Sequence, residues 1–573
     1  MLKIEPLQRR FLPTDFKVTD WKALEPYFQI LLGRDISTRD DFDQFQRDIN
    51  EISCILGEES TWRFIRTTTH TNDQAAQDAY SNMNNNITPA ASEMSNKLTK
   101  KLLASPFSDQ PRDEAERLMF RGMKAADKMF RSENIPLMTE LRQLSVDSDK
   151  LRGSMTVELD GETLTIPQLS GRFYSPDRAV REKAWHAMHG RRLQDKEKYD
   201  TIFDQMVKKR HQIALNAGYK NFRDYQFDAM QRFDYTPEDC MTFHAAIRKH
   251  FTPLVTDLYR KRSQQMQLDR LMPWDMMVDP LGRPALKVFA SSDDLLEKGL
   301  VMLDGVDPFF GDVVRLQRDM GRLDLASRPH KRPGAYNSGL PETNVPFMFA
   351  NTTDKVNDVR MFVHEAGHAG HSLLAVDLPL QAYKRVPIEM AELASMSMEL
   401  LVFDKWSIFL SDTEECERAQ EDFLEEVMLK FLPVAQGDLF QHEIYTHLDM
   451  TSEDRNDLWY DQLKGFTPAG IDLGSYPEIH RTRWHNVSHF FGTPFYYIEY
   501  LISQMGALQI WRNYLHDPQK TIKQYKEALA LGYTKSLPEL YRIAGIKFDF
   551  SEAMIADLVP FLTERLACYK NKE

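Results

Sequence analysis

The sequence predicts a mainly α-helical fold with small β elements, and two observations lead to this prediction. Apolar residues recur at helical spacing over long stretches, whereas the features of strands are confined to two short segments. The chain also lacks a fixed-period repeat and a low-complexity tract. The longest segments with helical spacing are 195–215, 239–268, 413–448 and 494–514.

Two of these helical segments contain a proline. Pro253 lies within 239–268 and Pro433 lies within 413–448. A proline inside a helix removes one backbone hydrogen bond and clashes with the preceding turn. Each segment is therefore predicted to be either one kinked helix or a pair of helices.

The two extended segments differ in their signals. Residues 154–169 alternate around Asp160-Gly161, a dipeptide typical of tight hairpin turns. Residues 334–351 combine Gly and Pro with a short apolar run, directly before the next helical segment. We expect a hairpin in the first segment and a small β element in the second.

Composition excludes several classes of protein. The 573 residues are 42% hydrophobic and 27% charged, as in ordinary globular proteins. With 72 basic and 85 acidic residues the net charge is -13, which argues against nucleic-acid binding. Four scattered cysteines form no CxxC pair, so neither a zinc ribbon nor a disulfide scaffold is expected. No run is apolar enough for a membrane span or a signal peptide, so a cytoplasmic protein without a membrane partner is expected.

The segment 358–375, DVRMFVHEAGHAGHSLLA, contains an HExxH pattern. On a helix, His364 and His368 share one face with Cβ atoms about 5–6 Å apart, so both imidazoles can reach one Zn²⁺ at about 2.0–2.1 Å. Glu365 lies beside that face, where it suits a base acting on a metal-bound water. The pattern predicts one catalytic zinc ion.

The surroundings of the motif support this prediction. Asp358 lies near the start of the helix, where a carboxylate caps backbone N–H groups and favours the positive helix end. Gly367 lowers helix stability, so its presence indicates close packing under the metal.

A catalytic zinc site needs a third protein ligand. His371 lies seven residues after His364, about 10 Å along the helix axis, too far to share one ion easily. A role near the site or in packing is expected for it instead. The metzincin pattern fails, because His371 and Leu374 occupy its Gly and third His positions.

The third ligand is therefore expected on another element. Residues 387–403, PIEMAELASMSMELLVF, predict a helix that carries Glu389, Glu392 and Glu399. Small residues around Glu392 allow a close approach to the first helix, and spacing modestly favours Glu392. Glu389 is the second candidate, and it is otherwise interpreted as a solvated surface residue. Glu399 is a candidate acceptor that orients a zinc-bound His.

These segments resemble the thimet oligopeptidase and oligoendopeptidase F family of zinc metallopeptidases. HEAGH, followed about two dozen residues later by EMAELAS, carries the resemblance, and the family's Glu at the Glu392 position completes its zinc site. Further similar segments are KRPGAY before VPFMFAN, HFFGTPFYYIEY, FYSPDRAVREKAWHA and RHQIALNAGYKNF. The resemblance implies a helical fold with a deep substrate channel. The similar segments run from about residue 150 to the end, and the first 150 residues are only compatible with the family. We therefore expect an N-terminal helical region, 1–150, and a catalytic helical region, 151–573, that contains the zinc site.

The resemblance also implies functional residues near the C-terminus. Tyr497 and Tyr500 are three residues apart, so their hydroxyls can emerge on one helix face, where they would stabilise an oxyanion. His489 is the residue that assists them. The spacing differs by one residue from the family pattern, so Tyr496 versus Tyr497 and His485 versus His489 stay open.

The predicted function is hydrolysis of internal peptide bonds in short unstructured peptides by a zinc-dependent oligoendopeptidase. A peptidyl-dipeptidase or carboxypeptidase with the same type of zinc site is the nearest alternative. A zinc aminopeptidase fits less well, because no GAMEN-type segment is found. A peptide-binding protein with a structural zinc leaves Glu365 unexplained, since such a site needs no base. The sequence leaves open the oligomeric state, the cleavage preference, the natural substrate, and whether the metal in the cell is zinc or another divalent ion.

Overall fold

The computed structural model describes residues 2–570, and its secondary structure confirms the mainly α fold with small sheets. Two compact units can be distinguished, and each is built from three separate stretches of chain. Unit 1 comprises residues 2–128, 286–420 and 503–548, and unit 2 comprises 129–285, 421–502 and 549–570. Among the described residues no helix is both long and apolar enough to cross a membrane.

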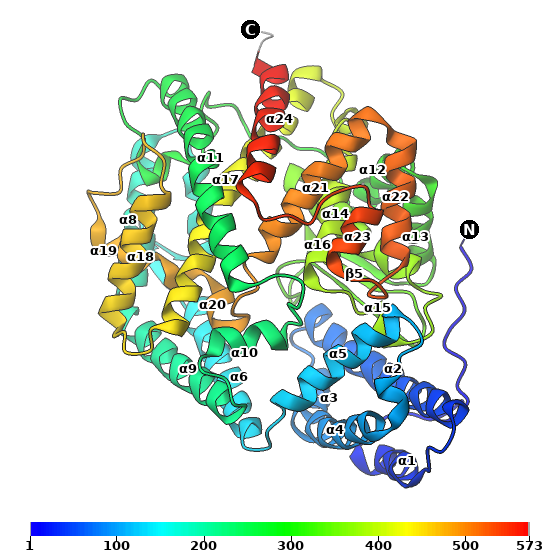
Figure 1. Cartoon of the computed structure of the whole chain (residues 1–573). Coiled ribbons are helices and arrows are strands. Elements are labelled where there is room, and N and C mark those ends of the chain that lie inside the picture. The colour runs from blue at the N-terminus through cyan, green and yellow to red at the C-terminus, as the bar shows by residue number, and fades with distance from the viewer. Residues whose placement is uncertain (1, 571–573) are drawn as a thin grey trace. The chain divides into compact units, whose positions relative to one another are not determined.

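Unit 1 begins with the helices at the blue end of the chain (Figure 1), and most of them contribute to one apolar core. A capping box starts the longest of them: the Thr38 hydroxyl accepts from the backbone N–H of Asp41, and the Asp41 carboxylate accepts from the backbone N–H of Thr38. These elements are α1 (Trp21–Gly33), α2 (Arg39–Thr69), α3 (Gln74–Asn82), the π turn η1 (Met83–Ile87), α4 (Thr88–Ala104), η2 (Pro106–Asp109) and α5 (Glu114–Met129).

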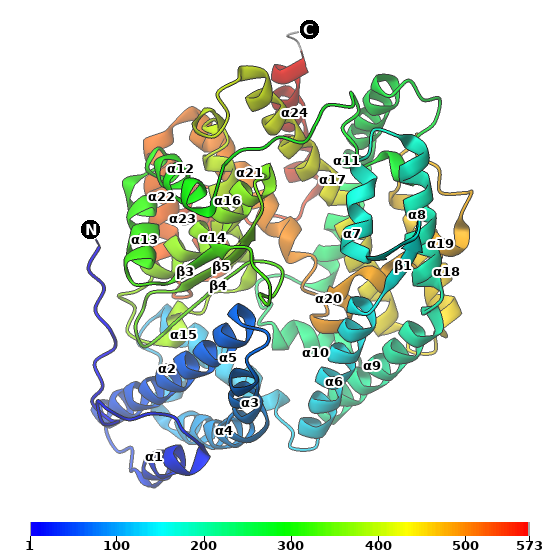
Figure 2. The same cartoon turned by 180° about the vertical axis from the view of Figure 1, so that it is seen from behind.

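The remaining part of unit 1 surrounds a three-stranded sheet. Its strands lie in the order β3-β5-β4, and Figure 2 shows them beside α14. Strand β3 pairs parallel with β5, whereas β4 pairs antiparallel with it. The elements are α12 (Ser292–Asp304), α13 (Pro308–Asp319), β3 (Leu323–Ala326), β4 (Tyr336–Ser338), β5 (Phe347–Thr352), α14 (Val356–Leu374), α15 (Gln381–Lys384), α16 (Ile388–Leu401), η5 (Trp406–Ile408), α22 (Pro518–Ala530) and α23 (Leu537–Ile543).

Unit 2 is helical apart from one hairpin. The predicted turn is confirmed, because Asp160 and Gly161 both have positive φ, at 55° and 82°, between β1 and β2. The elements are α6 (Asn134–Gly153), β1 (Thr156–Leu159), β2 (Glu162–Thr165), α7 (Ile166–Ser170), η3 (Gly171–Tyr174), α8 (Arg178–Leu193), α9 (Lys196–Asn216), α10 (Phe222–Ala229), α11 (Pro237–Gln265), η4 (Pro273–Asp275), α18 (Ser452–Phe466), α19 (Pro477–Arg481), η6 (Arg483–Asn486), α20 (Ser488–Gly492) and α24 (Glu552–Lys570).

Two long helices contribute residues to both units, namely α17 (Thr413–Thr446) and α21 (Glu499–His516). Each proline-containing segment proves to be one helix, with Pro253 inside α11 and Pro433 inside α17. Within unit 2, α11 and α17 pack against each other through Phe251 and Phe431, whose ring centroids lie 4.0 Å apart in a stacked arrangement. Such aromatic pairs add about 0.5–1.5 kcal/mol to the area that they bury.

Candidate metal centre

Helix α14 carries the HExxH residues and starts at a turn fixed by a carboxylate. Asp358 Oδ2 accepts the backbone N–H groups of Thr353 and Lys355 at 2.7 and 3.1 Å. The N-cap is Lys355, so Asp358 satisfies these donors from the third helical position rather than from the cap itself. The start of the helix is thereby fixed to the end of β5.

The structure brings His364, His368 and Glu392 together. One ligand atom from each lies within 4.8 Å of the others. His364 Nε2 lies 3.6 Å from Glu392 Oε2, and the two imidazole rings are 4.9 Å apart at 84°. Two ligands of one tetrahedral zinc, each at about 2.0–2.1 Å, lie about 3.3–3.4 Å apart. This nitrogen and carboxylate group therefore fits a single zinc ion.

Gly367 explains how α14 and α16 approach closely enough to share a metal. A Cβ added at Gly367 would lie 2.7 Å from Ser395 Cα and 2.8 Å from the carbonyl oxygen of Ala394. Any side chain at this position would push the helices apart. The close packing that the sequence indicated is therefore present, and it occurs against α16.

Glu399 lies behind the candidate metal ligands. Its Oε1 accepts from His364 Nδ1 at 2.8 Å, and Arg360 Nη2 lies 3.4 Å from its Oε2. This bond leaves His364 Nε2 directed toward Glu392. Burial alone would lower the pKa of His364, but the Glu399 bond and nearby carboxylates raise it to about 9.

Glu365 has the environment of a base rather than of a ligand. Its side chain is buried, and Oε2 has no hydrogen-bond partner among residues 2–570. Burial first, and then the charges of Glu392 and Glu399, raise its pKa to about 7. The backbone oxygen of Glu365 accepts from Asn337 Nδ2 on β4 at 3.1 Å. An unpartnered buried carboxylate oxygen suits a water molecule that donates to it.

The other candidate ligands lie outside the group. His371 is buried on α14, and burial lowers its pKa to about 4. Glu389 is only 2% exposed, so its interpretation as a solvated surface residue is wrong. Its backbone oxygen accepts from Ser503 and Tyr541, which fixes the first turn of α16. Neither residue contributes an atom to the group that could hold a metal.

The C-terminal residues that the resemblance singled out lie in unit 2 and also meet. His489 Nε2 lies 3.3 Å from the Tyr500 hydroxyl, and the ring of Tyr497 lies 5.3 Å from that of His489. Tyr497 precedes α21, however, so the expectation of one shared helix face is wrong. Buried Phe495 has φ of 66°, a strained value for a non-glycine residue, and its N–H donates to Gln441 at 2.7 Å.

The alternatives in this segment have different partners. His485 is buried, its Nε2 donates to Asp200 Oδ1 at 2.9 Å, and its ring stacks on Tyr199. Tyr496 packs 5.3 Å from Tyr500 through its ring. The hydroxyl of Tyr497 forms no hydrogen bond within the described part of the chain, and burial raises its pKa.

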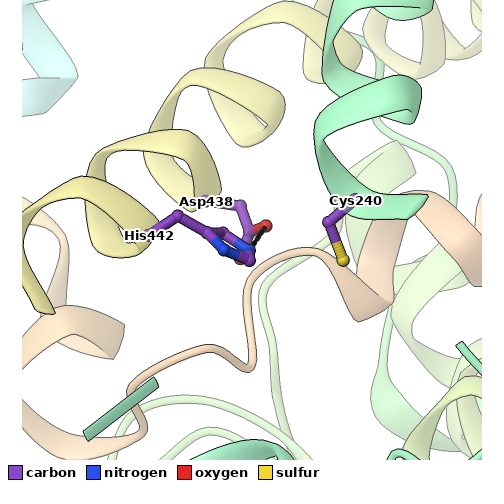
Figure 3. A group of neighbouring side chains, drawn as sticks. All are labelled: Cys240, Asp438 and His442. Atoms are coloured by element: carbon purple, nitrogen blue, oxygen red, sulfur yellow. Dashed lines mark ion pairs between the residues drawn. The ribbon is translucent and has the colours of Figure 1, made fainter. Parts of the chain in front are cut away.

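Unit 2 contains a second group of potential metal ligands, drawn in Figure 3. Cys240 comes from α11, whereas Asp438 and His442 lie one turn apart on α17. Asp438 Oδ2 also accepts from His244 Nε2 at 2.9 Å. In contrast to His364, neither His244 nor His442 has a partner for Nδ1 in the described residues. Asp438 is therefore best explained as the acceptor of a buried hydrogen bond from His244, which joins α17 to α11, rather than as a metal ligand.

Two contacts of the site were absent from the sequence analysis. Arg360 lies four residues before His364, a spacing that could have indicated its shared contact with Glu399. Asn337 lies 28 residues from Glu365 on a strand, and no local pattern indicated their contact.

Comparison with known proteins shows similarity over most of the chain and not only at the candidate metal centre. Peptidase family M3 matches residues 173–560, and the peptidase M3 N-terminal domain matches residues 11–130. The chain is 24% identical over 387 residues to Oligopeptidase PepF of Bacillus subtilis and 25% identical over 352 residues to Group B oligopeptidase PepB of Streptococcus agalactiae. These matches cover 67% and 60% of this chain but 56% and 55% of the relatives, little more than half of their length.

Among solved structures, PZ peptidase A with inhibitor 2 has a TM-score of 0.88 at 25% identity. The superposition covers 98% of this chain and 99% of that one. The family match extends over more than half of the sequence and includes every candidate ligand. The chain belongs to peptidase family M3.

Proposed function

We propose that this chain is a zinc-dependent oligoendopeptidase that hydrolyses internal peptide bonds of short, unstructured peptides. The observation that carries the proposal is the unpartnered, buried Oε2 of Glu365 next to the converging His364, His368 and Glu392. Binding of a metal ion without catalysis would require only the three ligands and would leave Glu365 without a role. A carboxylate with a raised pKa beside them supports hydrolysis, because it can accept and return a proton near neutral pH.

Each residue has a distinct role in the proposed reaction. His364, His368 and Glu392 hold the ion, which when bound supplies positive charge that acidifies water and polarises the scissile carbonyl. Glu365 takes the proton of the attacking water and passes it to the leaving amine. Glu399 holds His364 in one tautomer and orientation through the 2.8 Å bond to Nδ1.

Tyr497 and Tyr500 are proposed as donors to the oxyanion, with His489 assisting. The contact between His489 and the Tyr500 hydroxyl, and the unbonded hydroxyl of Tyr497, support these roles. A donor that strengthens its bond as negative charge develops lowers the barrier without tightening substrate binding.

The experiment is cleavage of an internally quenched peptide blocked at both ends, with mass analysis of the products. Internal cleavage that a chelator abolishes is the expected result. Trimming that occurs only after the C-terminus is freed would instead assign the peptidyl-dipeptidase or carboxypeptidase alternative. The cytoplasmic location, the deep channel and the division at residue 150 stay predictions.

Glu365→Gln separates chemistry from metal binding. The variant should keep its zinc and lose about 10²–10⁴-fold in kcat, because the amide accepts no proton. Glu297→Gln, on the exposed surface of α12, is the matched control and should keep full activity. Strong turnover by Glu365→Gln would remove the proposed base.

A further inference from the structure

Unit 2 contains a partly open cavity of about 660 Å³, and apart from Tyr497 the proposed chemistry uses none of its lining residues. This volume lies within the range of pockets that bind small ligands, about 300–1,000 Å³. Its walls come from α8, α11, α17, α18 and the short turns η4 and η6. Tyr497 also lines it, so the cavity adjoins one of the residues assigned to the oxyanion.

The charged side chains of this cavity are all of one sign. Arg192 from α8 and Arg483 from η6 line it together with His189. No Asp or Glu is among the described residues that line the cavity, although the protein as a whole carries 85 acidic and 72 basic residues. An anionic ligand would therefore meet attraction without an opposing carboxylate.

Neither guanidinium is neutralised by an acidic side chain in the described part of the chain. Among residues 2–570, Arg192 and Arg483 form no ion pair with an acidic side chain. Arg481, two residues before Arg483, instead contacts Glu453, Asp457 and Glu478 outside the cavity. The two like charges repel each other beside a partly apolar space, and an anion bound between them would relieve this repulsion.

The local electrostatics agree with this geometry. Desolvation by the surrounding protein lowers the pKa of Arg483, although the residue as a whole is exposed and lines the cavity. Burial, followed by repulsion from Arg483, lowers the pKa of Arg192 to about 10. Burial and both arginines hold the pKa of His189 far below its usual range, so it is neutral. Both arginines still carry their charge at neutral pH.

The other walls indicate which anion fits. Trp185, Trp274 and Trp459 line the cavity, together with methionine, leucine and proline side chains. Such walls favour a ligand whose charge is confined to one end of an apolar body. A guanidinium matches the two oxygens of a carboxylate through a pair of parallel hydrogen bonds.

We propose that this cavity binds the carboxylate of a short peptide between Arg192 and Arg483, while adjacent apolar side chains of the peptide pack on the tryptophans. The identification of the ligand as a peptide depends on the proposed function, because Tyr497, which is proposed there as a donor to the oxyanion, also lines this cavity. The carboxylate belongs either to the peptide C-terminus or to an Asp or Glu side chain. Both offer the same group to the arginines.

Binding is measured without turnover, by quenching of intrinsic tryptophan fluorescence in the full-length Glu365→Gln protein. The probe is a short, apolar peptide without tryptophan that has a free C-terminus. Three companions differ from it in one group, namely a C-terminal amide, an amide with one internal Asp, and the same amide with Asn. Arg483→Gln and Arg192→Gln should weaken binding of carboxylate peptides about ten- to hundredfold.

The companion peptides identify the source of the carboxylate. Loss of affinity in the C-terminal amide assigns the C-terminus, and recovery with internal Asp but not Asn assigns a side chain. Equal affinity for all four peptides would overturn the proposal. Inorganic phosphate that quenches and competes as well as the peptide would overturn it as well, in favour of a general anion site.

Two controls separate binding from folding. Arg481→Gln removes the same charge from the neighbouring ion-paired arginine and should keep the discrimination between acid and amide. Arg483→Lys keeps the positive charge but lacks the planar guanidinium, so it should retain part of the difference in affinity between acid and amide peptides that Arg483→Gln loses. Arg483→Gln should also leave the thermal midpoint unchanged or raised, whereas a fall of many degrees would assign Arg483 a structural role.

The cleavage test and the fluorescence test can contradict the proposed function and the proposed cavity ligand independently of each other. Absence of cleavage by the wild-type chain would contradict the proposed function even if carboxylate peptides bind. Cleavage without any effect of Arg192→Gln or Arg483→Gln on carboxylate affinity would contradict only the cavity assignment.

Discussion

Glu399 Oε1 lies 2.8 Å from His364 Nδ1, so an acidic residue on α16 fixes the first histidine of the HExxH motif on α14. Glu392, two turns earlier on the same face of α16, lies 3.6 Å from the other nitrogen of the same ring. Helix α16 therefore supplies both a candidate ligand and the group that orients its neighbour. This arrangement leads to a first prediction about metal affinity.

Glu399→Gln should weaken zinc binding about 10–100-fold, because a neutral amide oxygen accepts from His364 Nδ1 more weakly than a carboxylate does and makes Nε2 a less basic ligand. Competition with a chromophoric chelator measures the affinity. Glu297→Gln serves as the surface control. Unchanged affinity in Glu399→Gln would show that the orientation of His364 is set by packing alone.

Gly367→Ala should separate α14 from α16, because the new Cβ meets Ser395 Cα at 2.7 Å. We expect a loss of about 1–3 kcal/mol in the free energy of unfolding, together with weaker metal binding. Gly190→Ala is the matched control, since Gly190 is exposed within α8 and a Cβ there meets nothing within 4 Å. That substitution should stabilise the chain by up to about 1 kcal/mol. The thermal midpoint and the zinc content of both variants are measured. Equal values for Gly367→Ala and Gly190→Ala would contradict the proposed role of Gly367 in the close packing of the two helices.

Tyr497→Phe and Tyr500→Phe should each lower kcat by about 10²–10³-fold with little change in KM or zinc content. The reason is that their hydroxyls are proposed to donate only when the oxyanion forms. Tyr496→Phe provides the comparison within the same segment. If Tyr496→Phe has the large effect and Tyr497→Phe has none, the donor role moves to Tyr496.

Cys240→Ser should leave the zinc content at one ion per chain, whereas Glu392→Ala should abolish stoichiometric binding. Cys240, Asp438 and His442 lie close enough to hold a metal, but His442 has no second partner to fix its ring in the described chain. Elemental analysis of the purified protein distinguishes the two groups. Two ions per chain, one of them lost in Cys240→Ser, would establish a second site.

Asp275 predicts how stability depends on pH in unit 2. It is fully buried and pairs with Arg178 and Arg181, each through an N–O distance of 2.8 Å. Burial raises its pKa, but these hydrogen bonds outweigh burial and hold the pKa below its usual value. A lowered carboxyl pKa stabilises the fold above the unfolded value of about 3.9 and loses this effect as the pH falls through the folded value.

Asp275→Asn should therefore lower the free energy of unfolding by about 3–5 kcal/mol at neutral pH. The difference in thermal midpoint from the wild type should be constant between about pH 6 and 8 and shrink below about pH 4. Asp461→Asn, in an exposed pair with Lys464, should change stability by less than about 1 kcal/mol. A pH-independent difference for Asp275→Asn would exclude the ion pair as its cause.

Local sequence patterns identified the elements but not all of their ends. The hairpin at Asp160-Gly161 was predictable because positive φ at two positions requires such residues. Strand β3 was missed, since its partner β5 lies elsewhere in the chain and parallel pairing leaves no turn signal. The late start of α21 depends on the strained turn at Phe495, which Gln441 holds from another helix.

The sequence by itself determined the helical class, the family resemblance and the pair His364 and His368, because a four-residue spacing on a helix is a local geometric fact. The tertiary structure decided that Glu392 rather than Glu389 joins them, since α16 touches α14 at Gly367 and only one face of α16 can meet the histidines. It also brought Arg192 and Arg483 to one cavity. Contacts between residues far apart in sequence depend on how helices pack, and no local periodicity records that packing.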